Sequence, residues 1–126
     1  MKNMITEDYV SFETAKLLKE KGFDGDIDLW YNSDGEIFHL CHYDYNATKY
    51  FACVQCPTLQ MAMKWLRDVH NISVEPFVDF GSGDEYWWTV DVAYIKKNGL
   101  IDELCGYNSY EEACEAAIKY CLVNLI

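Results

Sequence analysis

Apolar residues recur every three or four positions in three parts of the chain, which is the spacing of one face of an α-helix. The first part is VSFETAKLLKEKGF, residues 10–23, where Ser11 has the side-chain oxygen that an N-cap needs. At its far end Gly22 tolerates a left-handed backbone, and Phe23 can fold back on Leu18 in a Schellman-type stop. The pattern therefore predicts a helix with one apolar face over this segment.

Two further helices are predicted later in the chain. One begins near Pro57-Thr58, and proline suits the first turn of a helix because it has no N–H to leave unpaired. Its predicted apolar stripe consists of Leu59, Ala62, Met63, Leu66 and Val69. The other opens with Ser109 and Glu112, which form a capping box, and continues to the last residue.

Alternating apolar and polar residues between the helices predict β-strands. In LWYNSDGEIFHLCH, residues 29–42, two apolar runs surround the turn residues 32–35, which predicts a hairpin. Because neighbouring side chains of a strand point to opposite faces, Tyr31 is expected to face the core and Trp30 to face away from it.

After the second helix, the runs 72–80, 86–94 and 100–105 predict a meander of three antiparallel strands. Pro76 cannot donate a ladder hydrogen bond, so the first of these strands is expected at a sheet edge. The order is α-ββ-α-βββ-α, which predicts an α+β fold with three helices packed on one face of a mainly antiparallel sheet. Residues 1–126 are expected to form a single domain.

The three helical segments carry a resemblance to known sequences. YVSFETAKLLKEKGFD, PTLQMAMKWLRDVHNI and SYEEACEAAIKYCLVNLI occur in this order, and together they resemble small uncharacterised proteins of phages and mobile elements of gut Bacteroidales. The likeness covers less than half of the chain. It implies a prokaryotic, phage-type origin, and it implies no activity and no functional residues.

Charge narrows the range of partners. The 126 residues include 21 Asp and Glu against 10 Lys and Arg, for a formal net charge of −11. Nucleic acid and anionic membranes would be repelled, because both are bound mainly through clustered Lys and Arg. No stretch is long and apolar enough for a membrane span, and the first residues lack the pattern of a signal peptide. We therefore expect a cytoplasmic protein with free thiols.

Aromatic residues outside the predicted core indicate a binding surface, because Tyr and Trp supply contact area at low entropic cost. The residues expected to contribute to it are Trp30, Tyr43, Tyr45, Tyr50 and Trp87. The alternative is that these rings pack under the helices or in a homodimer.

Thiol and imidazole groups near the second helix raise two chemical alternatives. Cys53 and Cys56 have the spacing of half a zinc site, which His39 and Cys41 would have to complete. Such a site would make the chain a zinc-stapled structural domain. In the redox alternative, Cys56 lies at the N-cap of the helix, where the dipole favours a thiolate. The predicted order of elements lacks the βαβ context that this chemistry usually has.

No catalytic motif is present, and no cofactor is expected. The leading hypothesis is a small acidic, non-enzymatic binding protein that engages a protein of the host, with a basic protein as one candidate. The first alternative to this hypothesis is a protein that binds or sequesters a small, nucleotide-like molecule in an aromatic pocket, and the second is the zinc-stapled domain. The single arginine, Arg67, weakens the first alternative because an anionic ligand needs cations in its pocket.

Overall fold

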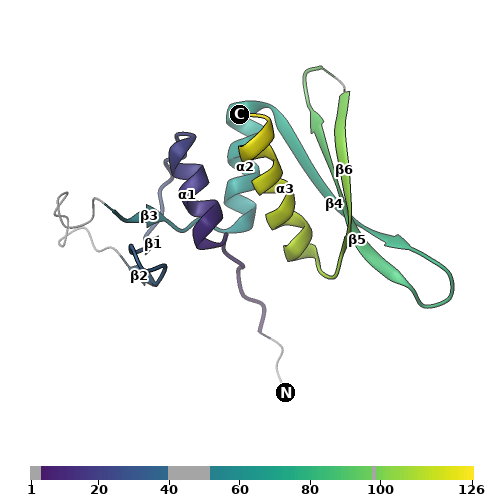
Figure 1. The fold of residues 1–126 in the computed structure, drawn as a ribbon, viewed down its shortest axis with the longest axis horizontal. Helices are drawn as coiled ribbons and strands as arrows, with labels where there is room; N and C mark the ends of the chain where they lie inside the picture. The colour runs from purple at the N-terminus through teal and green to yellow at the C-terminus, as the bar shows by residue number, and fades with distance from the viewer. Residues whose placement is uncertain (1–3, 40–51, 98) are drawn as a thin grey trace.

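The computed structural model of the protein describes residues 4–39, 52–97 and 99–126. Within these ranges the elements follow in the order helix, three short strands, helix, three long strands, helix (Figure 1). They are α1 (Phe12–Glu20), β1 (Leu29–Tyr31), β2 (Ile37–His39), β3 (Val54–Gln55), α2 (Leu59–His70), β4 (Ile72–Phe80), β5 (Tyr86–Tyr94), β6 (Gly99–Tyr107) and α3 (Tyr110–Asn124). Apart from the added two-residue β3, this order confirms the predicted α+β fold.

The strands form two separate antiparallel sheets, whereas the sequence pattern predicted helices on one face of a single sheet. The short sheet has the order β2-β1-β3, and the long sheet has the order β4-β5-β6. α2 and α3 pack on the long sheet, while α1 contacts α3 and β3, so the helices lie between the sheets (Figure 1). β1 does not pair with the long sheet. It is joined to the segment before α2, where the Cys56 N–H donates to the Leu29 carbonyl at 2.9 Å.

The first helix is closed at both ends by the predicted residues. Ser11 Oγ accepts a hydrogen bond from the Thr14 N–H at 3.2 Å. At the other end Gly22 has φ 90°, and the Phe23 N–H donates to the Leu18 carbonyl at 2.9 Å. These bonds confirm the N-cap and the Schellman motif.

The second helix starts at the predicted Pro57-Thr58 junction, but the threonine is its cap and the proline lies outside its first turn. Thr58 Oγ1 accepts a hydrogen bond from the Met61 N–H at 3.1 Å, so Pro57 precedes the cap. Val69 is 58% exposed because it lies at the edge of the stripe in the last turn, so its predicted place in the core is wrong. The buried members of the stripe are Leu59, Ala62, Met63 and Leu66.

The third helix begins with the predicted capping residues in a modified arrangement. Ser109 Oγ accepts from the Glu112 N–H at 3.1 Å, while the Glu112 carboxylate accepts from the Asn108 N–H at 2.9 Å. The return bond of an ordinary capping box would come from Ser109 itself. No helix within the described residues is long and apolar enough to cross a membrane.

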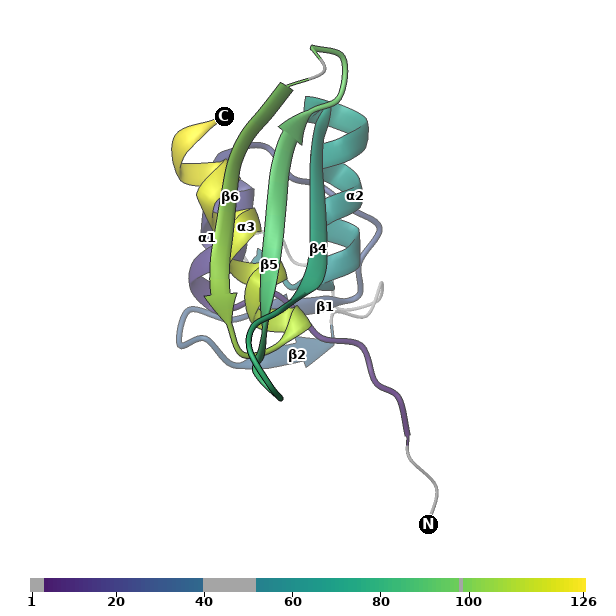
Figure 2. The same cartoon turned by 90° about the vertical axis from the view of Figure 1, so that its right-hand side faces the viewer.

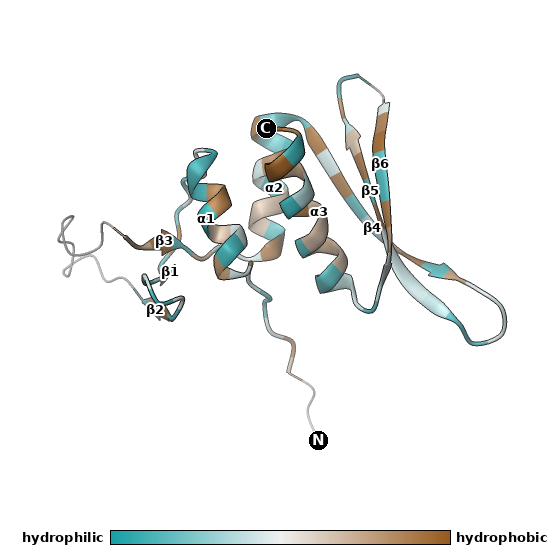
Figure 3. Ribbon diagram, viewed as in Figure 1, coloured by the Kyte–Doolittle hydropathy of each residue, from teal (hydrophilic) through white to brown (hydrophobic). Residues whose placement is uncertain are grey.

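The core lies between the helices and the inner face of the long sheet. Cross-strand partners such as Val74 and Val92 place alternate residues of β4 and β5 on this inner face. Hydrophobic and hydrophilic residues accordingly alternate along the first half of β4 (Figure 3). β4 is an edge strand that contains Pro76, as predicted, so the missing N–H leaves the ladder intact.

Candidate functional site

Of the five aromatic residues predicted to form a binding surface, the two that the structure describes, Trp30 and Trp87, lie apart. Trp30 lies on β1 in the short sheet, and Trp87 lies on β5 in the long sheet, with the helices between the two sheets (Figure 1). The other three predicted residues, Tyr43, Tyr45 and Tyr50, lie outside the described residues. The two tryptophans therefore belong to different sites.

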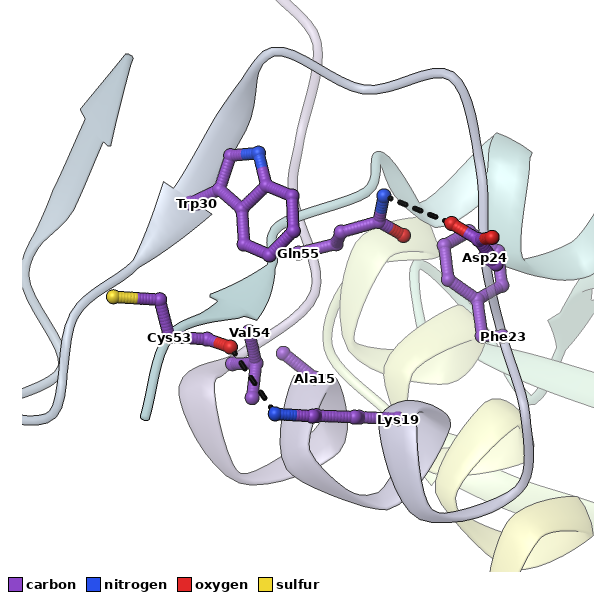
Figure 4. A pocket seen from close by; sticks show the side chains of 8 residues that line it. All are labelled: Ala15, Lys19, Phe23, Asp24, Trp30, Cys53, Val54 and Gln55. Atoms are coloured by element: carbon purple, nitrogen blue, oxygen red, sulfur yellow. Dashed lines mark hydrogen bonds between the residues drawn. The ribbon is translucent and has the colours of Figure 1, made fainter. Parts of the chain in front are cut away.

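Trp30 lines a small cavity between α1, β1 and β3 (Figure 4). Trp30 and the buried Tyr31 face opposite sides of β1, as predicted. The Trp30 side chain is nevertheless half-buried, beside its cross-strand neighbours Phe38 and Gln55. The cavity has a volume of about 250 Å³. Pockets for small molecules usually measure about 300–1,000 Å³, so this cavity is small for a nucleotide-like ligand.

The polar groups of this cavity bind one another. Lys19 Nζ donates to the Cys53 carbonyl at 3.3 Å. The Gln55 amide is held in two directions, since Nε2 donates to the Gly25 carbonyl at 2.7 Å and Oε1 accepts from the Gly25 N–H at 3.0 Å. These bonds hold the wall of the cavity in place. They give Lys19 and Gln55 a structural role that needs no ligand.

The candidate zinc ligands are divided among different places. Cys53 lines the Trp30 cavity, whereas Cys56 is fully buried beside the Tyr31 hydroxyl. His39 and Cys56 flank Leu29 from opposite sides, which separates them by two strand spacings, about 10 Å. Cys41 lies outside the described residues, and within the described part of the chain no three His, Cys, Asp or Glu side chains are grouped to hold a metal ion.

The environment of Cys56 also removes the basis of the redox alternative. The residue precedes the helix cap by two positions and is 0% exposed, so it does not occupy the predicted N-cap. Burial raises the pKa of its thiol, although a hydrogen bond with Tyr31 opposes the shift. A reactive cysteine needs the opposite, a lowered pKa and solvent access.

Trp87 belongs to the hairpin that joins β4 and β5, whose end, residues 79–87, we call the hairpin tip. Its side chain is half-buried against the turn of the tip. A Cβ added to Gly81 would approach the Trp87 ring to 2.9 Å and Glu85 Oε2 to 2.7 Å. A larger residue at position 81 would therefore require these two side chains to shift.

The hairpin tip extends beyond the rest of the fold (Figure 1). β6 reaches only to Tyr107, the partner of Trp88, and the ring of Tyr110 at the start of α3 packs edge-on against Trp88 at 5.6 Å. Past this point Phe80 and Tyr86 pair only with each other. They are 73% and 63% exposed, respectively.

The alternation along β4 and β5 predicts Phe80 and Tyr86 on the apolar, core-facing sides of their strands, and their exposure contradicts that prediction. Both residues do lie on the inner face of the sheet, but the helices cover this face only as far as Trp88. The lengths of the strands could have indicated this exposure. The turn at 81–85 sets the register of β4 and β5. The few residues between the β5–β6 turn and Ser109 limit the length of β6, so β6 cannot extend along the whole hairpin.

An acidic groove of about 680 Å³ lies between the N-terminal segment and α3. Its carboxylates come from Asp8, Glu111, Glu112 and Glu115, and its aromatic rings from Tyr9, Tyr31 and Tyr107. Lys119, the one cation in its lining, is bound to Glu13 at 2.8 Å. The groove repels anions, so it gives a nucleotide phosphate no binding group.

The comparisons with known proteins leave the site to be judged from its own geometry. No family model, no curated protein and no solved structure matches the chain. Of the described surfaces, the hairpin tip combines the largest exposed aromatic side chains with a projecting backbone.

Proposed function

We propose that the chain is a small acidic, non-enzymatic binding protein that engages a protein partner through the hairpin tip. The observation that carries the proposal is the exposure of Phe80 and Tyr86, 73% and 63%, at the end of the hairpin. Large aromatic side chains that the fold leaves in water lose that unfavourable contact when a partner covers them. Aromatic residues are also enriched among the anchors of protein interfaces.

Charge makes a basic partner the best complement. Residues 71–95, which include β4, the tip and β5, contain five Asp and Glu and no Lys or Arg. An acidic surface of this kind raises the rate of encounter with a basic surface and repels acidic competitors. If the chain has the phage-type origin that its helical segments imply, the partner is a host protein.

The alternatives receive less support from the geometry. The Trp30 cavity is small for a nucleotide, and the acidic groove is repulsive to phosphate. A zinc-stapled domain would need Cys53 and Cys56 to converge. The described cysteines are free thiols, which supports a reducing, cytoplasmic location as part of the proposal.

The test is a quantitative affinity purification from cells of the source organism, with wild type and a Phe80→Ser, Tyr86→Ser variant as baits. A matched control carries Val69→Ser and Ile95→Ser, which replace two apolar residues 58% and 46% exposed elsewhere on the surface. We expect a basic protein to be recovered with wild type and control. Its recovery should fall at least tenfold with the tip variant.

Direct binding of the purified partner then measures the affinity of each bait. Equal affinity of the tip variant and the control would contradict the proposal, as would the absence of any recovered protein. Circular dichroism of all three baits excludes unfolding as the cause of a loss.

A further inference from the structure

The outer face of the long sheet is left open by the described part of the chain. Figure 2 views the molecule from this side and shows β4, β5 and β6 in front of the helices. The side chains on this face are those that alternate with the buried Ile72, Val90 and Val92. An antiparallel sheet with one solvated face is common, so openness alone indicates no partner.

The composition of this face is unusual because acidic residues stand directly opposite one another. Asp91 on β5 is the cross-strand partner of Glu75 on β4 and of Glu103 on β6. The three carboxylates therefore form a row across the sheet, which we call the acidic row. Like charges directly opposite are destabilising, and cross-strand pairs of opposite charge are the favourable arrangement.

Among the described residues, no Lys or Arg forms an ion pair with this row. A hydrogen bond with Asp91, and then the charge of Asp91, raise the pKa of Glu103. Asp91 Oδ1 is buried and has no hydrogen-bond partner among the described residues. Ser73 Oγ donates to Glu75 Oε1 at 2.8 Å, which supplies a dipole but no positive charge.

An apolar strip, made of Phe77 and Trp87, lies next to the acidic row. Phe77 on β4, 37% exposed, lies two residues from Glu75 and is the partner of the buried Thr89. The half-buried Trp87 lies two residues beyond Thr89 on β5, opposite Asp79. Residues two apart in a strand are separated by about 7 Å. A second extended chain laid along the strands has the same period, so its alternate side chains would meet the acidic row and the apolar strip in turn.

We infer that this face binds an extended segment of a basic protein, which places a Lys or Arg on the acidic row and an apolar side chain on Phe77 and Trp87. The inference rests on the proposed function and names the chemistry of its partner. A second copy of the chain is a poor occupant, because two chains of charge −11 would set acidic faces against each other.

The probe is the synthetic peptide Thr-Lys-Thr-Val-Thr-Lys-Thr-Val-Thr, which presents Lys and Val alternately on one side when extended. Its affinity is measured by titration, and its position by amide and indole NMR shifts of the isotope-labelled protein. We expect saturable binding with shifts at Glu75, Asp91, Glu103 and the Trp87 indole. Shifts at the groove residues Asp8 and Glu111 instead, or no saturable binding, would overturn the inference.

A charge-matched pair of variants separates the acidic row from net charge. Glu75→Gln with Glu103→Gln should weaken peptide binding at least tenfold, a loss of about 1.4 kcal/mol. Glu20→Gln with Glu36→Gln makes the same change of charge at exposed positions on α1 and the β1–β2 turn, and should leave affinity within twofold. Equal weakening in both variants would mean non-specific attraction and reject the site.

The same variants distinguish failure of the inference from failure of the proposed function. A natural partner that needs Phe80 and Tyr86 but binds the Glu75→Gln, Glu103→Gln variant normally would leave the proposed function in place and reject the acidic row as its contact. Loss of the partner with both the tip and the row variants supports the inference.

Discussion

The thiols of α3 show how burial alone sets the chemistry of a residue. Cys114 and Cys121 are 0% exposed and lie on the buried face of α3. Desolvation disfavours the charged thiolate and raises the pKa of Cys114 to about 11 and that of Cys121 to about 12. Both residues therefore act as small apolar groups at neutral pH, as their spacing on an apolar stripe predicts.

These pKa shifts predict a loss of stability in alkaline solution. The folded pKa lies above the unfolded value of about 8.5, so between these two values the unfolded chain loses a proton that the folded chain keeps. The contribution of each thiol to the free energy of unfolding is therefore complete below about pH 8.5. It is lost as the pH rises from there through the pKa of the folded state. The free energy of unfolding should fall by about 1 kcal/mol per pH unit for each thiol.

Urea unfolding at successive pH values from 8 to 10.5 measures this slope. Cys121→Ala should lower stability at pH 8, because it leaves a cavity, and should also flatten the slope. Cys105→Ala removes an exposed thiol and should leave the slope unchanged. Equal slopes for wild type and Cys121→Ala would contradict the assignment.

At the scale of single elements, the helix caps connect the sequence to the fold most directly. Thr58→Ala removes the oxygen that accepts the Met61 N–H, and it should lower the free energy of unfolding by about 1 kcal/mol. Thr58→Ser keeps that oxygen and should stay within a few tenths of a kcal/mol of wild type. Chemical denaturation of both variants checks the prediction, and an equal loss in both would show that the methyl group, not the cap, matters.

The long sheet gives a second prediction at this scale. Replacing Glu103 by Gln removes one of the like charges opposite Asp91, so the free energy of unfolding should rise. Glu20→Gln, at an exposed position of α1, provides the control with the same change of net charge. If Glu103→Gln destabilises the protein, or stabilises it no more than the control does, the pair is not repulsive in the folded state.

Elements with a local cause were predictable from the sequence, and elements that depend on distant partners were not. Ser11, Gly22 and Ser109 act through bonds within a few residues, so pattern and residue type located their helices. Whether the 29–39 hairpin joins the long sheet depends on which strand edge it meets, which no local pattern encodes. The exposure of Tyr86 likewise depends on where α3 stops covering the sheet.

The candidate surfaces follow the same division. The acidic excess was evident from composition, and the strand that contains Trp87 was evident from alternation. The acidic row could not be predicted, because it depends on the register of three strands. That register includes a bulge on β6 between the partners of Val92 and Ala93. Counting residues from the turns cannot place Glu103 opposite Asp91 once a bulge shifts the register by one.

For the whole molecule, net charge makes stability depend on salt. A formal charge of −11 on 126 residues gives mutual repulsion that is greater in the folded chain, where the charges are closer together. Salt screens this repulsion, because the Debye length falls from about 30 Å at 0.01 M to about 3 Å at 1 M. The urea midpoint should therefore rise as NaCl increases from 0.01 to 0.5 M, with an unchanged denaturant slope.

Salt should have opposite effects on stability and on partner binding, and this contrast tests the two roles of the charge together. Screening relieves repulsion within the folded chain, but it also weakens attraction between an acidic face and a basic segment. The Glu75→Gln, Glu103→Gln variant should therefore show a smaller rise of the urea midpoint with NaCl and a weaker salt dependence of peptide affinity than the Glu20→Gln, Glu36→Gln control. Identical salt responses of the two variants would mean that net charge, and not the arrangement of carboxylates on the long sheet, governs both properties.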